Sequence, residues 1–163
     1  MSSIQRILCP TDFSEGSRAA LVYALNLGQQ LHASVTLLHV TPIPTYIMPG
    51  GTYPPMADQS ALMMESAQKQ LNAWIKEYTN ATTLNIDSAL RKGNTYRQIN
   101  EVAEAMDVNL VVMGTHGRSG LAHFILGSVA ERVVRTSQRP VLTVPSRPAA
   151  ERPDVEHANN APL

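Results

Sequence analysis

The feature that most constrains this fold is a regular alternation of short apolar runs with amphipathic stretches. The runs are bounded by turn residues and rich in aliphatic side chains, as expected of buried strands; they cover residues 4–9, 34–40, 83–90, 108–113 and 141–144. Between them, apolar residues recur at helical spacing in residues 15–32, 58–78, 95–106 and 128–136. Strands that alternate with helices favour an α/β fold, an open, mostly parallel five-stranded sheet with helices on both faces.

Composition limits the partners and the compartment. With 13 basic and 13 acidic residues among 163, the chain is formally neutral and lacks the basic footprint of a nucleic-acid binder. Its length suits one domain with a sizeable core. Cys9 is the only cysteine, which excludes an intrachain disulfide and a cage of several thiolates around a metal ion. The sequence shows neither a long apolar span nor a signal-peptide pattern, so we expect a cytoplasmic protein without membrane insertion.

Two segments depart from the alternation. Prolines and glycines crowd residues 41–57, a pattern that predicts no regular structure. Because apolar residues accompany the prolines, this segment is open to two interpretations, a mobile surface excursion or a lid or subunit contact. Residues 146–163 contain three prolines and no hydrophobic period, so we predict a disordered tail after a single domain of residues 1–145.

A glycine-rich segment follows the fourth apolar run. The run ends at Gly114, a loop contains Gly117 and Gly120, and Gly127 with Ser128 precedes the last helical stretch. A strand, a glycine loop and a helix start can direct several backbone N–H groups toward one point, which is the chemistry of a phosphate site. A Walker A loop is excluded because no lysine follows Gly127, and the GxGxxG dinucleotide motif is excluded because the first strand leads into CPTDFSEG.

The ends of two other strands offer further pocket residues. In open parallel sheets, ligands lie outside the carboxyl ends of the strands, near the point where the strand order reverses. Thr11 and Asp12 follow the first strand, and Val40 ends the second. The Asp12 carboxylate can accept hydrogen bonds from a ribose, and the backbone of Val40 can read the edge of an adenine. The sequence therefore indicates a nucleotide pocket at this edge of the sheet.

The glycine segment also resembles a known signature. The spacing Gly-x2-Gly-x9-Gly-Ser, formed by Gly114, Gly117, Gly127 and Ser128, resembles the nucleotide-binding signature of the universal stress proteins. The segments RILCPTDFS, SVTLLHV and ILGSVAERVVR are also similar to parts of that family, so the resemblance covers residues 4–145. It implies a Rossmann-like sheet in strand order 3-2-1-4-5, ATP binding and a role in stress response.

The resemblance assigns a role to each part of the pocket. Asp12 would hold the ribose, the backbone of Val40 would meet the adenine, and Gly114 would lie beside the ribose and the α-phosphate. Backbone N–H groups of Gly117, Gly127, Ser128 and Val129, with the Ser128 hydroxyl, would bind the phosphates. The phosphates would carry Mg²⁺ or Mn²⁺ with them. The full set of expected site residues is Pro10, Thr11, Asp12, Val40, Met113, Gly114, Gly117, Arg118, Gly127, Ser128 and Val129. A homodimer, or a larger oligomer, would form through the last strand, Val141–Val144, and an unidentified protein partner would respond to the nucleotide.

Structural roles remain open for several residues. Asp12 could simply cap the first helix. Ser128 with Glu131 has the spacing of a capping box, so this serine could also serve the helix. Cys9 and His39, near the ends of two apolar runs, could form a reactive dyad, although a buried thiol and a satisfied strand histidine are the ordinary interpretation.

The residues also leave more than one function open. No lysine or arginine is evidently placed for a γ-phosphate and no base for a water molecule, so we expect a regulatory ATP-binding module rather than an efficient enzyme. The alternatives are a slow ATPase, a binder of another adenine nucleotide such as AMP or cyclic AMP, and a structural interaction protein with an unused pocket. Arg118, in the glycine loop, could face either a phosphate or the solvent.

Overall fold

The computed structural model describes residues 3–43, 46–48, 51–53, 57–79, 84–115 and 126–145. Its strands are β1 (Arg6–Thr11), β2 (Ser34–Thr41), β3 (Tyr46–Met48), β4 (Gly51–Tyr53), β5 (Ile86–Lys92), β6 (Leu110–Gly114) and β7 (Val141–Val144). Its helices are α1 (Glu15–Leu31), α2 (Ala57–Thr79), α3 (Thr95–Ala105) and α4 (Ser128–Thr136). Apart from the short strands β3 and β4, strands and helices alternate as the sequence pattern predicts.

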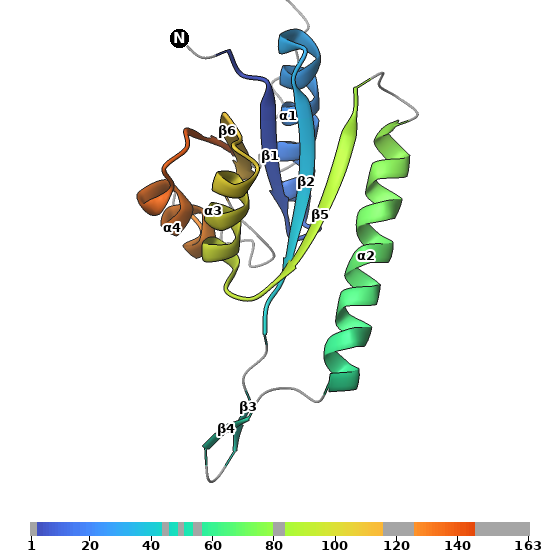
Figure 1. Ribbon diagram of the computed structural model, residues 1–163, viewed down its shortest axis with the longest axis vertical. Coiled ribbons are helices and arrows are strands. Elements are labelled where there is room, and N and C mark those ends of the chain that lie inside the picture. Colours follow the sequence, from blue (N-terminus) through green and yellow to red (C-terminus); the bar gives the residue numbers. More distant parts are fainter. Residues whose placement is uncertain are drawn as a thin grey trace, which may run out of the picture.

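The main sheet contains β5, β2, β1, β6 and β7 in that order, and every neighbouring pair is parallel. When these five strands alone are numbered along the chain, the order is 3-2-1-4-5, which confirms the predicted fold. The chain leaves β1 for α1 on one face of the sheet and leaves β6 for α4 on the other (Figure 1). This change of direction leaves a crevice at the carboxyl ends of the two strands.

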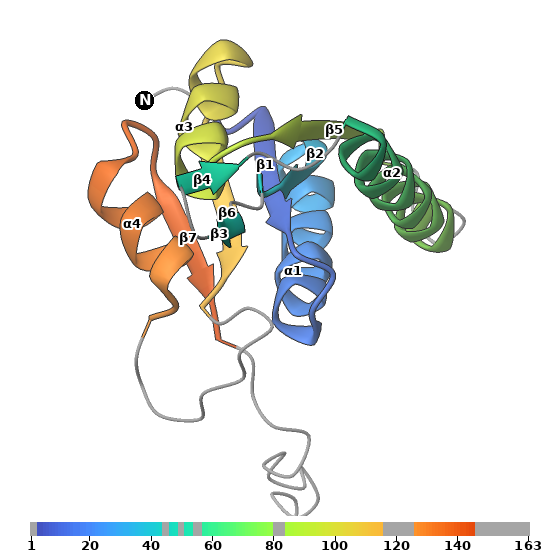
Figure 2. The same ribbon diagram turned by 90° about the horizontal axis from the view of Figure 1, so that it is seen from below.

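Helices cover both faces of the main sheet. α1 and α2 pack on one face, and α3 and α4 pack on the other (Figures 1 and 2). Alternate strand residues supply the two cores, so that Ile7 and Cys9 pack with α1 and α2 while Leu8 packs with α3 and α4. Because both faces are buried, the central strands have continuous apolar sequences rather than an apolar and polar alternation.

The C-terminal half of α2 is anchored to α1. Trp74 is buried, and the Arg18 guanidinium lies 4.5 Å from the centroid of its ring. Arg18 also donates hydrogen bonds to Glu77 (2.7 Å) and to the Tyr78 hydroxyl (3.1 Å). A cation over an aromatic face, with its charge paired, holds the two helices in register. These contacts hold the C-terminal half of α2 against the first turn of α1.

Residues 41–57 contain regular structure, contrary to the prediction. β3 and β4 pair antiparallel, with Tyr46 opposite Tyr53 and Met48 opposite Gly51, and they form a separate two-stranded sheet. The five prolines of this segment all lie outside the two strands, so the strand residues keep the N–H groups that pairing requires. A lid or a subunit contact at this segment stays a hypothesis.

The third strand of the main sheet ends later than predicted. Arg91 and Lys92 continue the strand and pair with Val40 and Thr41 of β2. The chain turns only at Gly93, whose φ of 141° suits glycine. Charged side chains can extend an edge strand because they remain exposed to solvent, so the arginine and lysine do not mark the turn.

Some predictions fall outside the described residues. The tail at residues 146–163 is among them, as are Gly117, Gly120 and Arg118 of the glycine loop. Among the helices that the structure describes, none combines the length and the apolar character needed to cross a membrane.

Candidate functional site

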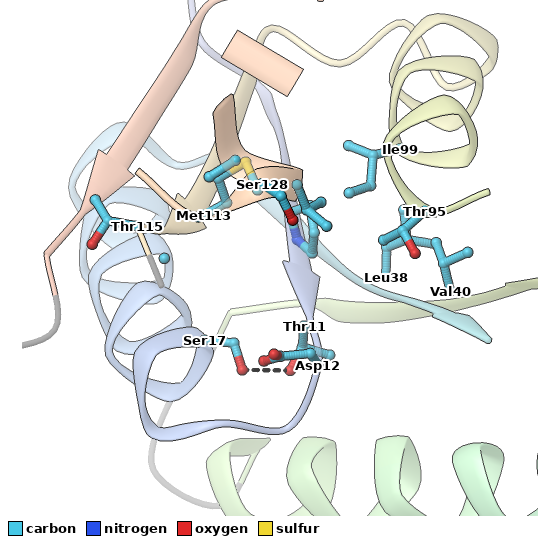
Figure 3. A pocket seen from close by; sticks show the side chains of 15 residues that line it. Thr11, Asp12, Ser17, Leu38, Val40, Thr95, Ile99, Met113, Thr115 and Ser128 are labelled. Atoms are coloured by element: carbon cyan, nitrogen blue, oxygen red, sulfur yellow. Dashed lines mark hydrogen bonds between the residues drawn. The ribbon is translucent and has the colours of Figure 1, made fainter. Parts of the chain in front are cut away.

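A pocket of about 330 Å³ lies at the carboxyl ends of β1, β2 and β6, beside the N-terminal ends of α3 and α4. It occupies the crevice between the central strands, where open parallel sheets bind their ligands. Its lining residues are Pro10, Thr11, Asp12, Ser17, Leu38, Val40, Thr95, Ile99, Met113, Gly114, Thr115, Gly127, Ser128, Val129 and Ala130. Figure 3 shows how these side chains converge from several strands and helices.

We call this cavity the first pocket. It brings together most of the predicted site residues. Those that line it are Pro10, Thr11, Asp12, Val40, Met113, Gly114, Gly127, Ser128 and Val129. Gly117 and Arg118 lie outside the described residues. The lining residues come from segments far apart in the sequence, which meet only because the strands are parallel and adjacent. What they bind stays a prediction.

Sequence reasoning missed other lining residues, namely Ser17, Leu38, Thr95, Ile99, Thr115 and Ala130. Leu38 carries a usable signal, because it precedes Val40 by two positions and therefore lies on the same face of β2. No local sequence signal indicates Thr95 and Ile99, since their place in the pocket depends on how α3 packs over the sheet.

The first pocket combines an apolar slot with a polar rim. Leu38, Val40, Ile99 and Met113 are all buried and form the slot. In Figure 3, Asp12 lies below this slot, apart from the side chains that form it. Pockets for small molecules typically have this composition, apolar walls with a few placed polar groups. A flat apolar group with polar substituents fits it.

Asp12 is half-buried, and the turn that follows it fixes its orientation. Its Oδ1 accepts hydrogen bonds from the backbone N–H (3.1 Å) and from the hydroxyl (2.5 Å) of Ser14. Ser14, and not Asp12, caps α1, because the Ser14 hydroxyl accepts the N–H of Ser17. The helix-cap role for Asp12 is therefore wrong, since an Asx turn places this residue two positions before the cap. The carboxylate instead borders the pocket.

The turn that presents Asp12 is strained and well bonded. Phe13 has a φ of 63°, in the left-handed region that bulky residues rarely adopt. Its N–H donates to the Thr11 hydroxyl oxygen (3.0 Å), and the Thr11 and Ser17 hydroxyls lie 3.0 Å apart. The Phe13 ring packs on His39, with 4.5 Å between the ring centroids. Strain of this kind persists only where surrounding contacts hold it, and it is common at functional sites.

The N-terminal end of α4 meets the pocket without a side-chain cap. Gly127 is the N-cap, and no side-chain hydrogen bond satisfies the first turn within the described residues. Ser128 is the first helical residue, so the capping box with Glu131 does not form, and Glu131 pairs instead with Arg135 at 2.9 Å. The first N–H groups of a helix have no intrahelical acceptor and carry the positive end of its dipole. This end of the pocket therefore suits an anion.

Cys9 and His39 do not form a dyad. The strand register places Cys9 opposite Leu37 and His39 opposite Thr11. His39 Nδ1 lies 2.8 Å from the Thr11 carbonyl oxygen, which can only accept, so this nitrogen donates. Burial raises the pKa of the Cys9 thiol to about 12, far from a reactive thiolate. The ordinary interpretation, a buried thiol and a satisfied histidine, is confirmed.

Within the residues described, no group of three or more His, Cys, Asp or Glu side chains is arranged to hold a metal ion. A divalent ion carried by ligand phosphates stays a prediction.

Comparisons with known proteins identify the class. The sequence model of the Universal stress protein family matches residues 3–145, so the chain belongs to the universal stress protein family. Universal stress protein MJ0531 of Methanocaldococcus jannaschii is 32% identical over 142 residues, which are 86% of this chain and 81% of that protein. The solved structure of MJ0577 from the same organism has a TM-score of 0.74 at 26% identity, covering 90% of this chain and 99% of that one. A universal stress protein solved in complex with cAMP has a TM-score of 0.56 at 24% identity, covering 88% of this chain and 98% of its own, which shows a likeness of fold.

Proposed function

We propose that this universal stress protein is a regulatory module of the stress response that binds ATP in the first pocket. The observation that carries the proposal is one pocket combining the apolar slot, the Asp12 carboxylate and the uncapped start of α4. These three features match the three parts of a nucleotide, a flat base, a ribose and phosphates. A cytoplasmic location remains our expectation from the sequence.

The apolar slot would take the adenine. Leu38 and Ile99 are buried and offer apolar surface to the faces of the ring, and Met113 adds a polarizable side chain. Val40 lies just beyond the last pair between β1 and β2, Thr11 with His39, where the sheet opens. We propose that its backbone contacts the polar edge of the base on the β1 side of the strand, since on the other side Val40 pairs with Arg91.

The polar rim would take the ribose and the phosphates. Asp12, already oriented by Ser14, can accept hydrogen bonds from ribose hydroxyls. The start of α4 would hold the phosphates through its free N–H groups and the Ser128 hydroxyl, and Gly127 leaves them room. Mg²⁺ or Mn²⁺ would travel on the phosphates. Gly117 and Arg118 belong to this proposal as further phosphate contacts.

The choice of ATP rests on the Gly-x2-Gly-x9-Gly-Ser spacing, which matches the signature of the nucleotide-binding branch. Cyclic AMP is the alternative, since a relative of the same fold has been solved with cAMP. We propose binding without rapid turnover. Of the described residues that line the first pocket, none is a lysine or an arginine, and the Asp12 carboxylate would contact the ribose rather than the phosphates.

We further propose a homodimer, or a larger assembly, joined through β7. Among the described strands, β7 pairs with β6 alone, and its valines Val141 and Val144 are half-buried. An apolar edge strand with unpaired backbone groups is usually covered, and a second copy would cover it. An unidentified protein partner would bind the ATP-bound and the ATP-free protein with different affinities.

The experiment that tests the proposal is the identification of the ligand. Small molecules released by denaturing freshly purified protein would be analysed by mass spectrometry, and calorimetry with ATP, AMP and cyclic AMP in the presence of Mg²⁺ would follow. We expect ATP to be recovered or to bind most tightly. Tighter binding of cyclic AMP than of ATP would support the pocket as a nucleotide site but identify cyclic AMP as its ligand. If none of the nucleotides binds, the protein is better explained as a structural interaction protein.

A further inference from the structure

A second pocket, of about 410 Å³, adjoins the first pocket at Asp12 and Val40. It is bounded by the ends of β1 and β2 and by the N-terminal half of α2. Eight residues line it and not the first pocket, among them Phe13, His39, Thr41, Met63, Ser66 and Gln70. Thr11, Asp12, Val40, Thr95 and Val129 line both pockets. The two cavities are therefore contiguous, and Asp12 stands at their boundary.

The second pocket has flat apolar walls with polar groups at its edge. The rings of Phe13 and His39 lie 4.5 Å apart and 30° from parallel, and Trp74 packs edge-on against Phe13. Met63 borders the pocket from α2, and Ser66 and Gln70 add a hydroxyl and an amide on the same helix. Apolar walls with a polar edge suit a planar group that carries hydrogen-bonding substituents.

Thr41 gives this pocket an unusual polar group. Its side chain is 5% exposed, and its Oγ1 is buried without a hydrogen-bond partner. Most buried polar atoms in native proteins have a partner, so an orphaned hydroxyl requires an explanation. Thr41 lines the second pocket and not the first, so a rotation of its side chain would let the hydroxyl pair with a group bound in the second pocket.

We propose that the second pocket is a subsite for a planar group attached to a ribose hydroxyl of the bound nucleotide. This inference rests on the proposed function, in which Asp12 holds the ribose. A substituent on one ribose hydroxyl would lie beside Asp12, where the two pockets meet, and extend into the second pocket, while the other hydroxyl remains free to donate to Asp12. The linkage should be neutral, because a phosphodiester at this point would face the Asp12 carboxylate and be repelled.

The test compares ATP with 2′(3′)-O-(N-methylanthraniloyl)-ATP, which carries a planar aromatic ester on the ribose. Both are titrated into the full chain with Mg²⁺ by calorimetry. The wild-type protein should bind the substituted nucleotide about fivefold or more tightly than ATP, because the added ring buries surface that ATP leaves open. Equal or weaker binding of the substituted nucleotide would exclude the subsite.

Two variants separate the subsite from the ATP site. Ser66 is exposed and, of the two pockets, lines only the second. Ser66→Phe should therefore fill the second pocket and leave the affinity for ATP unchanged. It should also abolish the tighter binding of the substituted nucleotide relative to ATP. Ala73→Phe, at an exposed position of the same helix outside both pockets, is the matched control and should keep the preference. Thr41→Val, which keeps the side-chain shape, should reduce only the preference and decides the question if Ser66→Phe does not fold.

The outcomes distinguish the subsite from the proposed function. A preference that survives in a folded Ser66→Phe variant would exclude the subsite while ATP binding stands. Binding of neither nucleotide by the wild-type protein would instead overturn the proposed function itself, and with it this inference.

Discussion

Gly114, at the end of β6, lies so close to Gly16, in the first turn of α1, that a Cβ atom on Gly114 would stand 2.8 Å from the Gly16 carbonyl oxygen. Real Cβ atoms essentially never approach a backbone oxygen so closely. The atoms that the Cβ would meet belong to the backbone of α1, so they cannot move aside as a flexible side chain would. The contact brings the end of β6 against the helix that follows Asp12. The glycine at position 114 is therefore required by packing, whether or not it also adjoins a ligand.

Gly114→Ala should destabilise the protein by about 1–3 kcal/mol, because the added methyl group must push α1 away from β6. Urea denaturation would measure the loss. Gly127→Ala is the matched control, since Gly127 has φ −57° and ψ 151°, values that alanine adopts without strain. Equal stability of the wild type and Gly114→Ala would contradict this packing.

Thr41→Val should stabilise the empty protein by about 1 kcal/mol, because it removes a buried hydroxyl that has no hydrogen-bond partner. Thr11→Val is the contrasting variant. The Thr11 hydroxyl accepts the Phe13 N–H and pairs with Ser17, so its removal should lower the free energy of unfolding. The two threonines should thus respond with opposite signs in thermal denaturation, and a loss of stability in Thr41→Val would show that its hydroxyl is bonded.

Val141→Lys combined with Val144→Lys should shift the protein toward monomer, since two charges on β7 would have to be buried against a second copy. Both valines also pack against the protein's own cores, so circular dichroism must first establish that the double variant folds. Multi-angle light scattering measures the mass directly. Val134→Lys, at an exposed position on α4, controls for added charge and should leave the mass unchanged. An unaltered mass in the double variant would remove β7 as the interface.

The Cys9 thiol should make stability fall at alkaline pH. Its pKa is about 12 in the folded protein against 9.0 for an unperturbed thiol, because burial disfavours the thiolate. The unfolded chain therefore releases this proton first. The thiol's contribution to stability is complete below pH 9 and decreases between pH 9 and 12, by about 1.4 kcal/mol per pH unit at most.

Cys9→Ala isolates this effect from other groups that titrate in the same range. At pH 8 the variant should be less stable than the wild type, because it leaves a small cavity. At pH 10.5 the difference in the free energy of unfolding should have narrowed. A difference that stays constant between the two pH values would show that the folded thiol ionises normally.

Several parts of this fold could be predicted because each follows from a local pattern in the sequence. The apolar runs predict the five strands of the main sheet, and their continuity reflects burial on both faces. The strand order, in contrast, came from the resemblance to a family. Apolar periodicity alone does not say which strands are neighbours.

Other parts depend on tertiary packing or on competition between similar residues. Thr95 and Ile99 enter the pocket only because α3 lies over β2, which no local pattern reveals. Asp12 and Ser14 are both good cap residues two positions apart, and the Asx turn at Asp12 leaves Ser14 as the cap. The hairpin of β3 and β4 was missed because its prolines all fall outside the paired residues.

The central claim is that ATP binds with its phosphates at the start of α4, and calorimetry of ATP with the wild type and Gly127→Val tests it most directly. The backbone angles of Gly127 allow valine, so the variant should fold, as circular dichroism can establish. We expect the wild type to bind ATP and the variant to bind at least about tenfold more weakly, because the valine side chain would occupy the phosphate position. A folded variant with wild-type affinity, or a wild-type protein that binds no ATP, would contradict the account.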